Sequence, residues 1–246
     1  MEIGLIDADL LDNGTRHPNI ALMKISAYRS QECDDHTRLL FDYNEVDNFD
    51  EVYISKVFTY TYCPQKILKQ TNVHYGGTGI FFDKAPDLPY EIDLHMPDYH
   101  LYDDFVKKEI ARGIKPGHFR DYLDYSIGFA TRGCFRRCDF CVNRKYDRVV
   151  RHAPIREFFD SSRKHIYLWD DNVLGYKRWH EVFYELADTD RRFQFRQGMD
   201  MRLMTEEKAS VISSSKYIGD FIFAFDFPKD RELIERKLKI WRKHCL

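Results

Sequence analysis

The sequence predicts an α/β protein in which a doubly wound, flavodoxin-like parallel sheet is followed by a partial (β/α) barrel of about four units. Apolar, strand-like stretches alternate with helix-like stretches, which is typical of a mostly parallel sheet. A proline-rich stretch separates an early series of these elements from a late one. The late series repeats about every 30 residues, as in a (β/α) barrel. We therefore assign a first domain to residues 1–83, a connector to 84–122 and the partial barrel to 123–246.

The early series alternates between the two kinds of element. Residues 19–30 have the apolar spacing of a helix, and Pro64 is placed to start a short one. Strands are expected at residues 2–7, 37–43 and 51–58, and the series ends at 72–82 with the glycine-rich turn "GGTG". We interpret this turn as a turn rather than a phosphate cradle, because the full dinucleotide-binding motif is missing.

The connector is marked by proline. Four of the chain's eight prolines fall between residues 84 and 118, mixed with aspartates and tyrosines. Proline interrupts both helices and central strands, so we expect an ordered linker with one short helix near residues 101–113.

The late series has four strand-like stretches, each followed by a helix-like one. The strands are expected at residues 125–130, 165–171, 193–200 and 217–226. Helices are expected to begin at residues 155–159, to cover 176–188, to follow Thr205 as N-cap, and to follow Pro228. Trp179, Phe183 and Leu186 share one helical face, as do Ile234, Leu238 and Trp241.

Composition restricts the class of protein. The 246 residues carry 43% hydrophobic and 32% charged residues, which is ordinary for a folded globular chain. The N-terminus is acidic, unlike a signal peptide, and no apolar run is long enough for a membrane span. A net charge of −2 gives no general attraction to nucleic acid. We therefore expect a cytoplasmic protein without membrane or nucleic-acid partners. The six cysteines are not expected to form a disulfide scaffold, and those that cluster are expected to bind metal.

Three of the cysteines stand within eight residues, in "TRGCFRRCDFCV". Cys134, Cys138 and Cys141 have CxxxCxxC spacing directly after a predicted strand, where α/β folds place their sites. Thiolates are the usual ligands of a [4Fe–4S] cluster, and three of them would leave one iron without a protein ligand. The alternative is a closed zinc site, for which His152 is the nearest fourth ligand.

The stretch "GFATRGCFRRCDFC", with an aromatic residue before the third cysteine, resembles the radical S-adenosylmethionine (SAM) superfamily. The resemblance implies an enzyme in which Cys134, Cys138 and Cys141 hold a [4Fe–4S] cluster and SAM binds the free iron. Reductive cleavage of SAM would then yield a 5′-deoxyadenosyl radical that abstracts hydrogen from a substrate. Phe140 would pack by the cluster and contact the adenine. It also implies a small-molecule or other unknown substrate and an electron donor such as a flavodoxin or ferredoxin. No catalytic side chain is identified.

Further cofactor-binding positions follow from that resemblance by their place after the barrel strands. Asp170, Asp171 and Asn172 end the second strand, where the superfamily binds the amino group of SAM; a helix cap or turn is the alternative. Arg196, on the third strand, would pair with the SAM carboxylate or an anionic substrate, unless it is simply a polar strand end. Asp226 ends the fourth strand and would meet the ribose or the substrate, or cap the next helix.

The second reading is a noncatalytic cysteine metal site, with zinc or iron–sulfur, that grips nucleic acid through neighbouring basic residues. These residues surround the cysteines: Arg132, Arg136, Arg137, Arg144, Lys145, Arg148 and Arg151. Other roles for them are to offset the charge of a cluster, to bind a phosphorylated substrate, or only to form a solvated face.

The early series, placed before such a barrel, resembles the cobalamin-binding domain of one branch of the superfamily. The branch's Asp-x-His-x-x-Gly motif is absent, since the loop after the first strand reads "DADLLDNGTRHPN" with His17 at another spacing. We therefore expect no cobalamin. Superfamily barrels usually have six units, so four imply a fragment or a truncated chain, and this leaves the activity of the chain by itself open.

Overall fold

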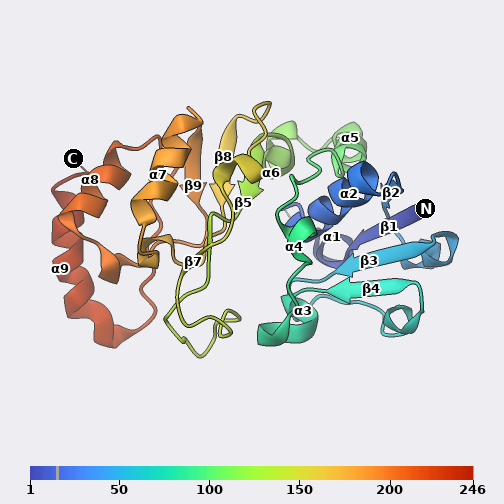
Figure 1. Cartoon of the computed structure of the whole chain (residues 1–246), viewed down its shortest axis with the longest axis horizontal. Coiled ribbons are helices and arrows are strands. Elements are labelled where there is room, and N and C mark those ends of the chain that lie inside the picture. Colours follow the sequence, from blue (N-terminus) through green and yellow to red (C-terminus); the bar gives the residue numbers. More distant parts are fainter. Residues whose placement is uncertain (15–16, 246) are drawn as a thin grey trace. The chain divides into compact units, whose positions relative to one another are not determined.

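The computed structural model describes residues 1–14 and 17–245. The chain divides into two compact units, Met1–Tyr125 and Ser126–Leu246, which are described separately (Figure 1). Within the described residues, no helix is both long and apolar enough to cross a membrane.

The first unit contains a four-stranded parallel sheet with the order β2-β1-β3-β4. This is the order of the first four strands in flavodoxin-like folds, as predicted. Ile3 on the central strand lies opposite Thr37 on one neighbour and Glu51 on the other. The strands are β1 (Glu2–Asp7), β2 (His36–Leu39), β3 (Glu51–Ser55) and β4 (Val73–Gly76).

Both faces of this sheet are covered, as a parallel sheet requires. Ile3 and Leu5 pack into one core with helix α2 (Ile20–Glu32), which Asn19 caps through its side chain. Ile6 and Ile54 pack into a second core on the other side. The remaining helical elements of the unit are α1 (Ala8–Asn13), η1 (Tyr43–Asn48), η2 (Ile67–Lys69), α3 (Thr78–Phe81), η3 (Phe82–Lys84), α4 (Tyr90–Asp93), α5 (Asp103–Ala111), η4 (Pro116–Phe119) and α6 (Arg120–Leu123).

Residues 84–122 contribute buried side chains to the first of these cores. Tyr99, Tyr102 and Val106 pack against Ile3, Leu5 and the buried face of α2, together with Phe119 and Tyr122. The helix expected near 101–113 is α5. These four aromatic residues thus serve as core packing, while Pro89 and Pro116 lie at the starts of the short helices α4 and η4.

Two early elements are shorter than expected. The strand predicted for 37–43 ends at Leu39, because Asp42 caps the 3₁₀ helix η1 by accepting a hydrogen bond from the Asn44 amide. The helix expected after Pro64 is only the single turn η2. The "GGTG" stretch runs from the end of β4 into the short helix α3: Gly77, between them, has φ +103°, and a Cβ there would lie 2.1 Å from the Lys56 carbonyl oxygen.

The second unit is built on a three-stranded sheet, β5-β8-β9, of which β8 and β9 are parallel. The helices that follow β8 and β9 bury the residues predicted to face the core, including Trp179, Phe183 and Leu186. Its main elements are β5 (Tyr125–Gly128), β8 (His165–Leu168), α7 (Trp179–Asp188), β9 (Arg192–Phe195), η7 (Met201–Leu203), α8 (Glu206–Ser214), η8 (Pro228–Asp230) and α9 (Arg231–Arg242). This is a partial barrel, with Thr205 as the N-cap of α8 as expected.

The fourth strand, predicted for 217–226, does not form as a regular strand. The segment pairs with β9 and the residues after it at only two isolated parallel bridges, Phe193 to Tyr217 and Met199 to Phe223. Between the bridges Gly219 has φ +72°, and the Gln194 side chain donates to the Asp220 carbonyl, so the ladder is interrupted. The helix expected from 155 is likewise only a 3₁₀ turn, η5 (Ile155–Glu157).

Candidate functional site

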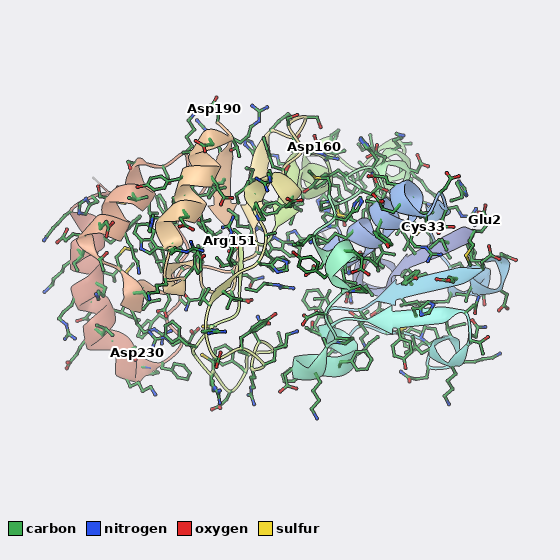
Figure 2. The ribbon with its side chains drawn as sticks, viewed as in Figure 1. Glu2, Cys33, Arg151, Asp160, Asp190 and Asp230 are labelled. Atoms are coloured by element: carbon green, nitrogen blue, oxygen red, sulfur yellow. The ribbon has the colours of Figure 1, made fainter. Side chains whose placement is uncertain are left out.

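The three clustered cysteines lie on a loop that a short antiparallel ribbon closes. The ribbon pairs β6 (Thr131–Arg132) with β7 (Val150–Arg151) and encloses residues 133–149. Arg151 anchors it to helix α7 through two contacts of 2.6 Å with the Glu185 carboxylate (Figure 2). The loop is therefore attached at its base to the strand β5 and to a helix of the barrel.

Gly133, immediately before the first cysteine, is required by the loop backbone. Its φ is +88°, and a Cβ at this position would lie 2.5 Å from the Arg148 carbonyl oxygen. Its amide donates to Asp171 at 2.6 Å. Only glycine satisfies both the left-handed conformation and the close approach.

The cysteine sulfurs receive hydrogen bonds from neighbouring amides. The Arg136 backbone N–H donates to Cys134 Sγ at 3.3 Å, and the Asn143 N–H donates to Cys141 Sγ at 3.4 Å. The Asn172 side-chain amide also donates to Cys134 Sγ at 3.3 Å. Donors of this kind stabilise a thiolate, the form that binds metal. Cys134, Cys138 and Cys141 are all free thiols of intermediate exposure.

Cys138 is coupled to both other cysteines. Burial raises the pKa of its thiol, and the nearby charges of Asp226, Cys141 and Cys134 raise it further. Cys138 therefore lies close enough to each of the other two cysteines for their charges to act on its thiol. A bound metal cation would offset the repulsion between the ionised thiols.

The cysteine loop can be compared with what a single metal ion and an iron–sulfur cluster each require of their ligands. Among the described residues, no three His, Cys, Asp or Glu side chains are arranged to hold one metal ion. His152, the candidate fourth zinc ligand, packs its ring edge-on against Phe129. A [4Fe–4S] cluster does not need ligands that converge on one point, because each thiolate binds a different iron.

Asp170 and Asp171 hold the cysteine loop in place. Asp170, 1% exposed, accepts hydrogen bonds from the amides of Ala130 and Thr131 at 3.1 and 2.6 Å and from the Thr131 hydroxyl at 2.5 Å. Burial raises the pKa of Asp170 to about 6, and those hydrogen bonds oppose the rise. Asp171 accepts from Gly133 and, at 2.5 Å, from the Asn143 side chain. Their roles toward a cofactor stay predictions.

Asn172 differs from its two neighbours because one of its polar atoms is unused. It is 3% exposed, and its Nδ2 contacts Cys134 Sγ. Its Oδ1 is buried and has no hydrogen-bond partner within the described chain. A buried acceptor without a partner is costly unless a ligand satisfies it.

An ion pair that the sequence did not reveal joins the loop, between its first two cysteines, to the segment that follows β9. Arg136, between the first two cysteines, contacts Asp200 at 3.0 Å, and Asp200 accepts from Arg202 Nε at 2.6 Å. Arg202 also reaches Asp230 at 2.7 Å, ahead of α9. Burial alone would raise the pKa of Asp200, but the two arginines hold it below its usual value. The residue types gave no signal, since the pairing depends on how the loop folds over the sheet.

The remaining predicted residues lie at two places. Phe140 is 63% exposed, and its ring centroid is 6.3 Å from that of Phe227, next to Asp226. Because the charge of Asp226 acts on Cys138, the structure brings the fourth strand position to the cysteine loop. Arg196 instead lies over the Tyr167 ring at 4.6 Å and donates to Gln194. No described contact links Arg196 to the cysteines.

No protein-family model and no curated protein matches the chain. Two solved structures are similar to it, both of the cobalamin-dependent S-adenosylmethionine radical enzyme OxsB. The form with aqua-cobalamin and S-adenosylmethionine bound has a TM-score of 0.58 and 12% identity, over 98% of this chain and 47% of that chain. The form with aqua-cobalamin alone has a TM-score of 0.45 and 14% identity, over 99% and 42%. The chain thus spans about half the length of OxsB, 47% in the first comparison, and at this identity the first match shows similarity of fold.

Proposed function

We propose that the chain is a radical SAM protein whose Cys134, Cys138 and Cys141 hold a [4Fe–4S] cluster. The single observation that carries the proposal is the cysteine loop: two thiols that receive amide hydrogen bonds, Cys134 and Cys141, flank Cys138 on a loop held by the aspartate after β8. The fold similarity to a radical SAM enzyme supports it. When bound, such a cluster supplies the electron that cleaves SAM to methionine and a 5′-deoxyadenosyl radical for hydrogen abstraction.

We propose different roles for the predicted SAM-binding residues. Asp170 has both oxygens occupied by the loop backbone, so we propose that Asp170 and Asp171 position the cysteines and do not bind SAM. Asn172 Oδ1 is a buried acceptor beside Cys134, suited to the amino group of SAM. Phe140 and Asp226, both exposed near the cysteines, are suited to the adenine and ribose. Arg196 is left for a carboxylate or an anionic substrate.

We do not propose that this chain binds cobalamin, although OxsB binds it. Asp9 stands two residues after Asp7, the spacing at which the Asp-x-His-x-x-Gly motif has its histidine. Its buried carboxylate accepts from the amides of Val57 and Phe58, at 2.6 and 3.2 Å, and from the Thr61 hydroxyl at 2.5 Å. A carboxylate occupied in this way does not replace a histidine ligand.

Anaerobic reconstitution with iron and sulfide tests the cluster. We expect about four irons per chain and broad visible absorption, both lost in Cys138→Ala. Cys33→Ala is the matched control, because Cys33 is an exposed free thiol of the first unit and should leave iron binding unchanged (Figure 2). One tightly held zinc per chain, or equal iron loss in both variants, would contradict the proposal.

A separate assay tests the reaction class. With reductant, the reconstituted chain should release 5′-deoxyadenosine from SAM. The alternative, a noncatalytic metal site that grips nucleic acid, rests on the exposed Arg137, Arg144 and Arg148. It predicts salt-dependent binding of an oligonucleotide and no SAM cleavage, so the two assays separate the candidates.

A further inference from the structure

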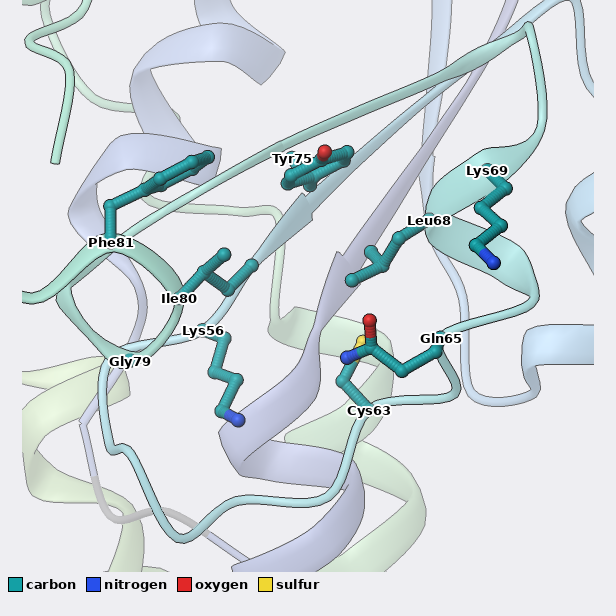
Figure 3. Close-up of a pocket in the computed structure, with 9 residues that line it drawn as sticks. All are labelled: Lys56, Cys63, Gln65, Leu68, Lys69, Tyr75, Gly79, Ile80 and Phe81. Atoms are coloured by element: carbon teal, nitrogen blue, oxygen red, sulfur yellow. The ribbon is translucent and has the colours of Figure 1, made fainter.

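A cavity of about 370 Å³ lies in the first unit, at the carboxyl ends of β3 and β4 (Figure 3). Its volume is within the range of small-molecule sites, and carboxyl ends of parallel strands are where doubly wound sheets bind ligands. It is separate from the cysteine loop, which belongs to the other unit. The lining comprises Lys56, Cys63, Gln65, Leu68, Lys69, Tyr75, Gly79, Ile80 and Phe81.

The charge of the lining is one-sided: it holds two lysines and no acid. Lys56 follows directly after β3, and within the described residues its ammonium has no carboxylate or hydrogen-bond partner. Asp9, the acid that holds the loop after Lys56, has its oxygens occupied by that loop. The lining itself therefore carries only positive charge, and the carboxylate charge of Asp9 acts on it from outside the lining.

Packing fixes the direction of the Lys56 side chain. A Cβ on Gly79 would lie 2.7 Å from Lys56 Cγ and 2.6 Å from the Phe58 carbonyl oxygen, so the stem of Lys56 runs over a position that only glycine leaves open. Figure 3 shows its amine directed toward Cys63 and Gln65. This side chain loses less entropy on binding than a freely rotating surface lysine.

Cys63 does not neutralise Lys56. Burial raises the pKa of the Cys63 thiol and the charge of Asp9 adds to the rise, while the hydrogen bond with Tyr43 and the charge of Lys56 only partly oppose it. The thiol is therefore uncharged at neutral pH, and the positive charge remains. Gln65 adds an amide that can both donate and accept.

The other wall is flat and apolar. The rings of Tyr75 and Phe81 stack with centroids 5.8 Å apart and planes 5° from parallel. Leu68 and Ile80 extend this surface. Such a wall accommodates a flat, apolar group better than a sugar or a hydrated ion.

We propose that this cavity binds a small aromatic anion, an aryl phosphate or aryl carboxylate, with the anionic group at Lys56 and Gln65 and the ring against Tyr75. The site is independent of the proposed cluster, so either proposal can fail without the other.

Calorimetric titration of the full chain with phenyl phosphate tests the site. We expect phenyl phosphate to bind at least about tenfold more tightly than phenol or inorganic phosphate, since each lacks one of the two complementary parts. Lys56→Gln should weaken binding about tenfold and Lys56→Arg should largely retain it. The matched control is Lys66→Gln, because Lys66 is an exposed neighbour outside the lining.

Tyr75→Leu gives a second test should the Lys56 variants unfold. It removes the aromatic wall at a residue that is 41% exposed, and it should weaken phenyl phosphate more than inorganic phosphate. Equal affinities for Lys56→Gln and Lys66→Gln would overturn the proposal, as would phenol binding as tightly as phenyl phosphate.

Discussion

The Arg136 guanidinium lies 3.0 Å from the Asp200 carboxylate and thereby ties the cysteine loop to the end of the third barrel strand. Asp200 is 6% exposed and also holds Arg202, which is 8% exposed. The loop is therefore fixed at three places: the ribbon at its base, the aspartates after β8, and this partly buried ion pair between its first two cysteines.

Removal of Asp200 should destabilise the second unit. Asp200→Ala leaves the buried Arg202 without this partner, and loss of one member of a buried pair costs about 3 kcal/mol. All three tryptophans, Trp169, Trp179 and Trp241, lie in this unit, so urea unfolding followed by tryptophan fluorescence measures its stability. Hydrogen exchange in residues 133–149 should also rise.

The matched control is Asp190→Ala. Asp190 pairs with Lys216 at a side chain that is 81% exposed, and exposed pairs contribute at most about 1 kcal/mol (Figure 2). If both variants lose the same stability, the Asp200 network does not support the loop.

Gly133→Ala should abolish iron binding although all three cysteines remain. The added methyl group meets the Arg148 carbonyl at 2.5 Å in a backbone of φ +88°, so the loop must move. Iron content after reconstitution measures the effect. Gly117→Ala is the control, because nothing lies within 4 Å of a Cβ there and iron binding should be unchanged. Full iron binding by Gly133→Ala would show that the loop geometry does not matter.

Local sequence patterns predicted most of the fold and placed the cysteine loop after β5. Alternating apolar stretches located β1, β2, β3, β5, β8 and β9, and caps such as Thr205 located helix starts, because these signals depend on neighbouring residues. The prediction of a regular fourth barrel strand was wrong. Its interruption at Gly219 depends on a contact with Gln194, and no local pattern records such a contact.

The functions of the polar residues after β8 were harder to predict. Asp170, Asp171 and Asn172 are adjacent in sequence, yet two of them occupy their oxygens on loop amides and one keeps a buried acceptor unused. The difference arises from the path of a loop about 40 residues earlier, which composition cannot supply. The Arg136–Asp200 pair was missed for the same reason.

Asn172→Ala should change the redox behaviour of a reconstituted cluster while leaving iron content intact. It removes the side-chain donor 3.3 Å from Cys134 Sγ, and hydrogen bonds to cluster sulfurs raise the reduction potential. We therefore expect a more negative midpoint potential in an EPR-monitored titration. Asn143→Ala is the comparison. It retains the backbone N–H that donates to Cys141 Sγ, so its midpoint potential should not shift in this way. An unchanged potential would show that the Asn172 donor does not reach a cluster ligand.

Asp7 should make the stability of the first unit depend on pH. Burial raises the pKa of Asp7 to about 7, and the hydrogen bond from Tyr102 only partly opposes the rise. Its protonated form is therefore favoured in the folded state. The stabilisation is complete below about pH 4, the pKa of an unfolded aspartate, and is lost as the pH rises to about 7, by up to about 4 kcal/mol.

Comparison with Asp7→Asn isolates this effect from that of other carboxylates. Asparagine cannot ionise, so the free energy of unfolding of the variant should lack the fall between about pH 4 and pH 7, whatever its stability at one pH. Urea unfolding followed by far-UV circular dichroism, across that range, measures both curves. Parallel curves would mean that Asp7 is ionised in the folded state. The carboxylate at the end of β1 would then be held by the Leu10 amide at 3.1 Å and the Tyr102 hydroxyl at 2.8 Å as an anion.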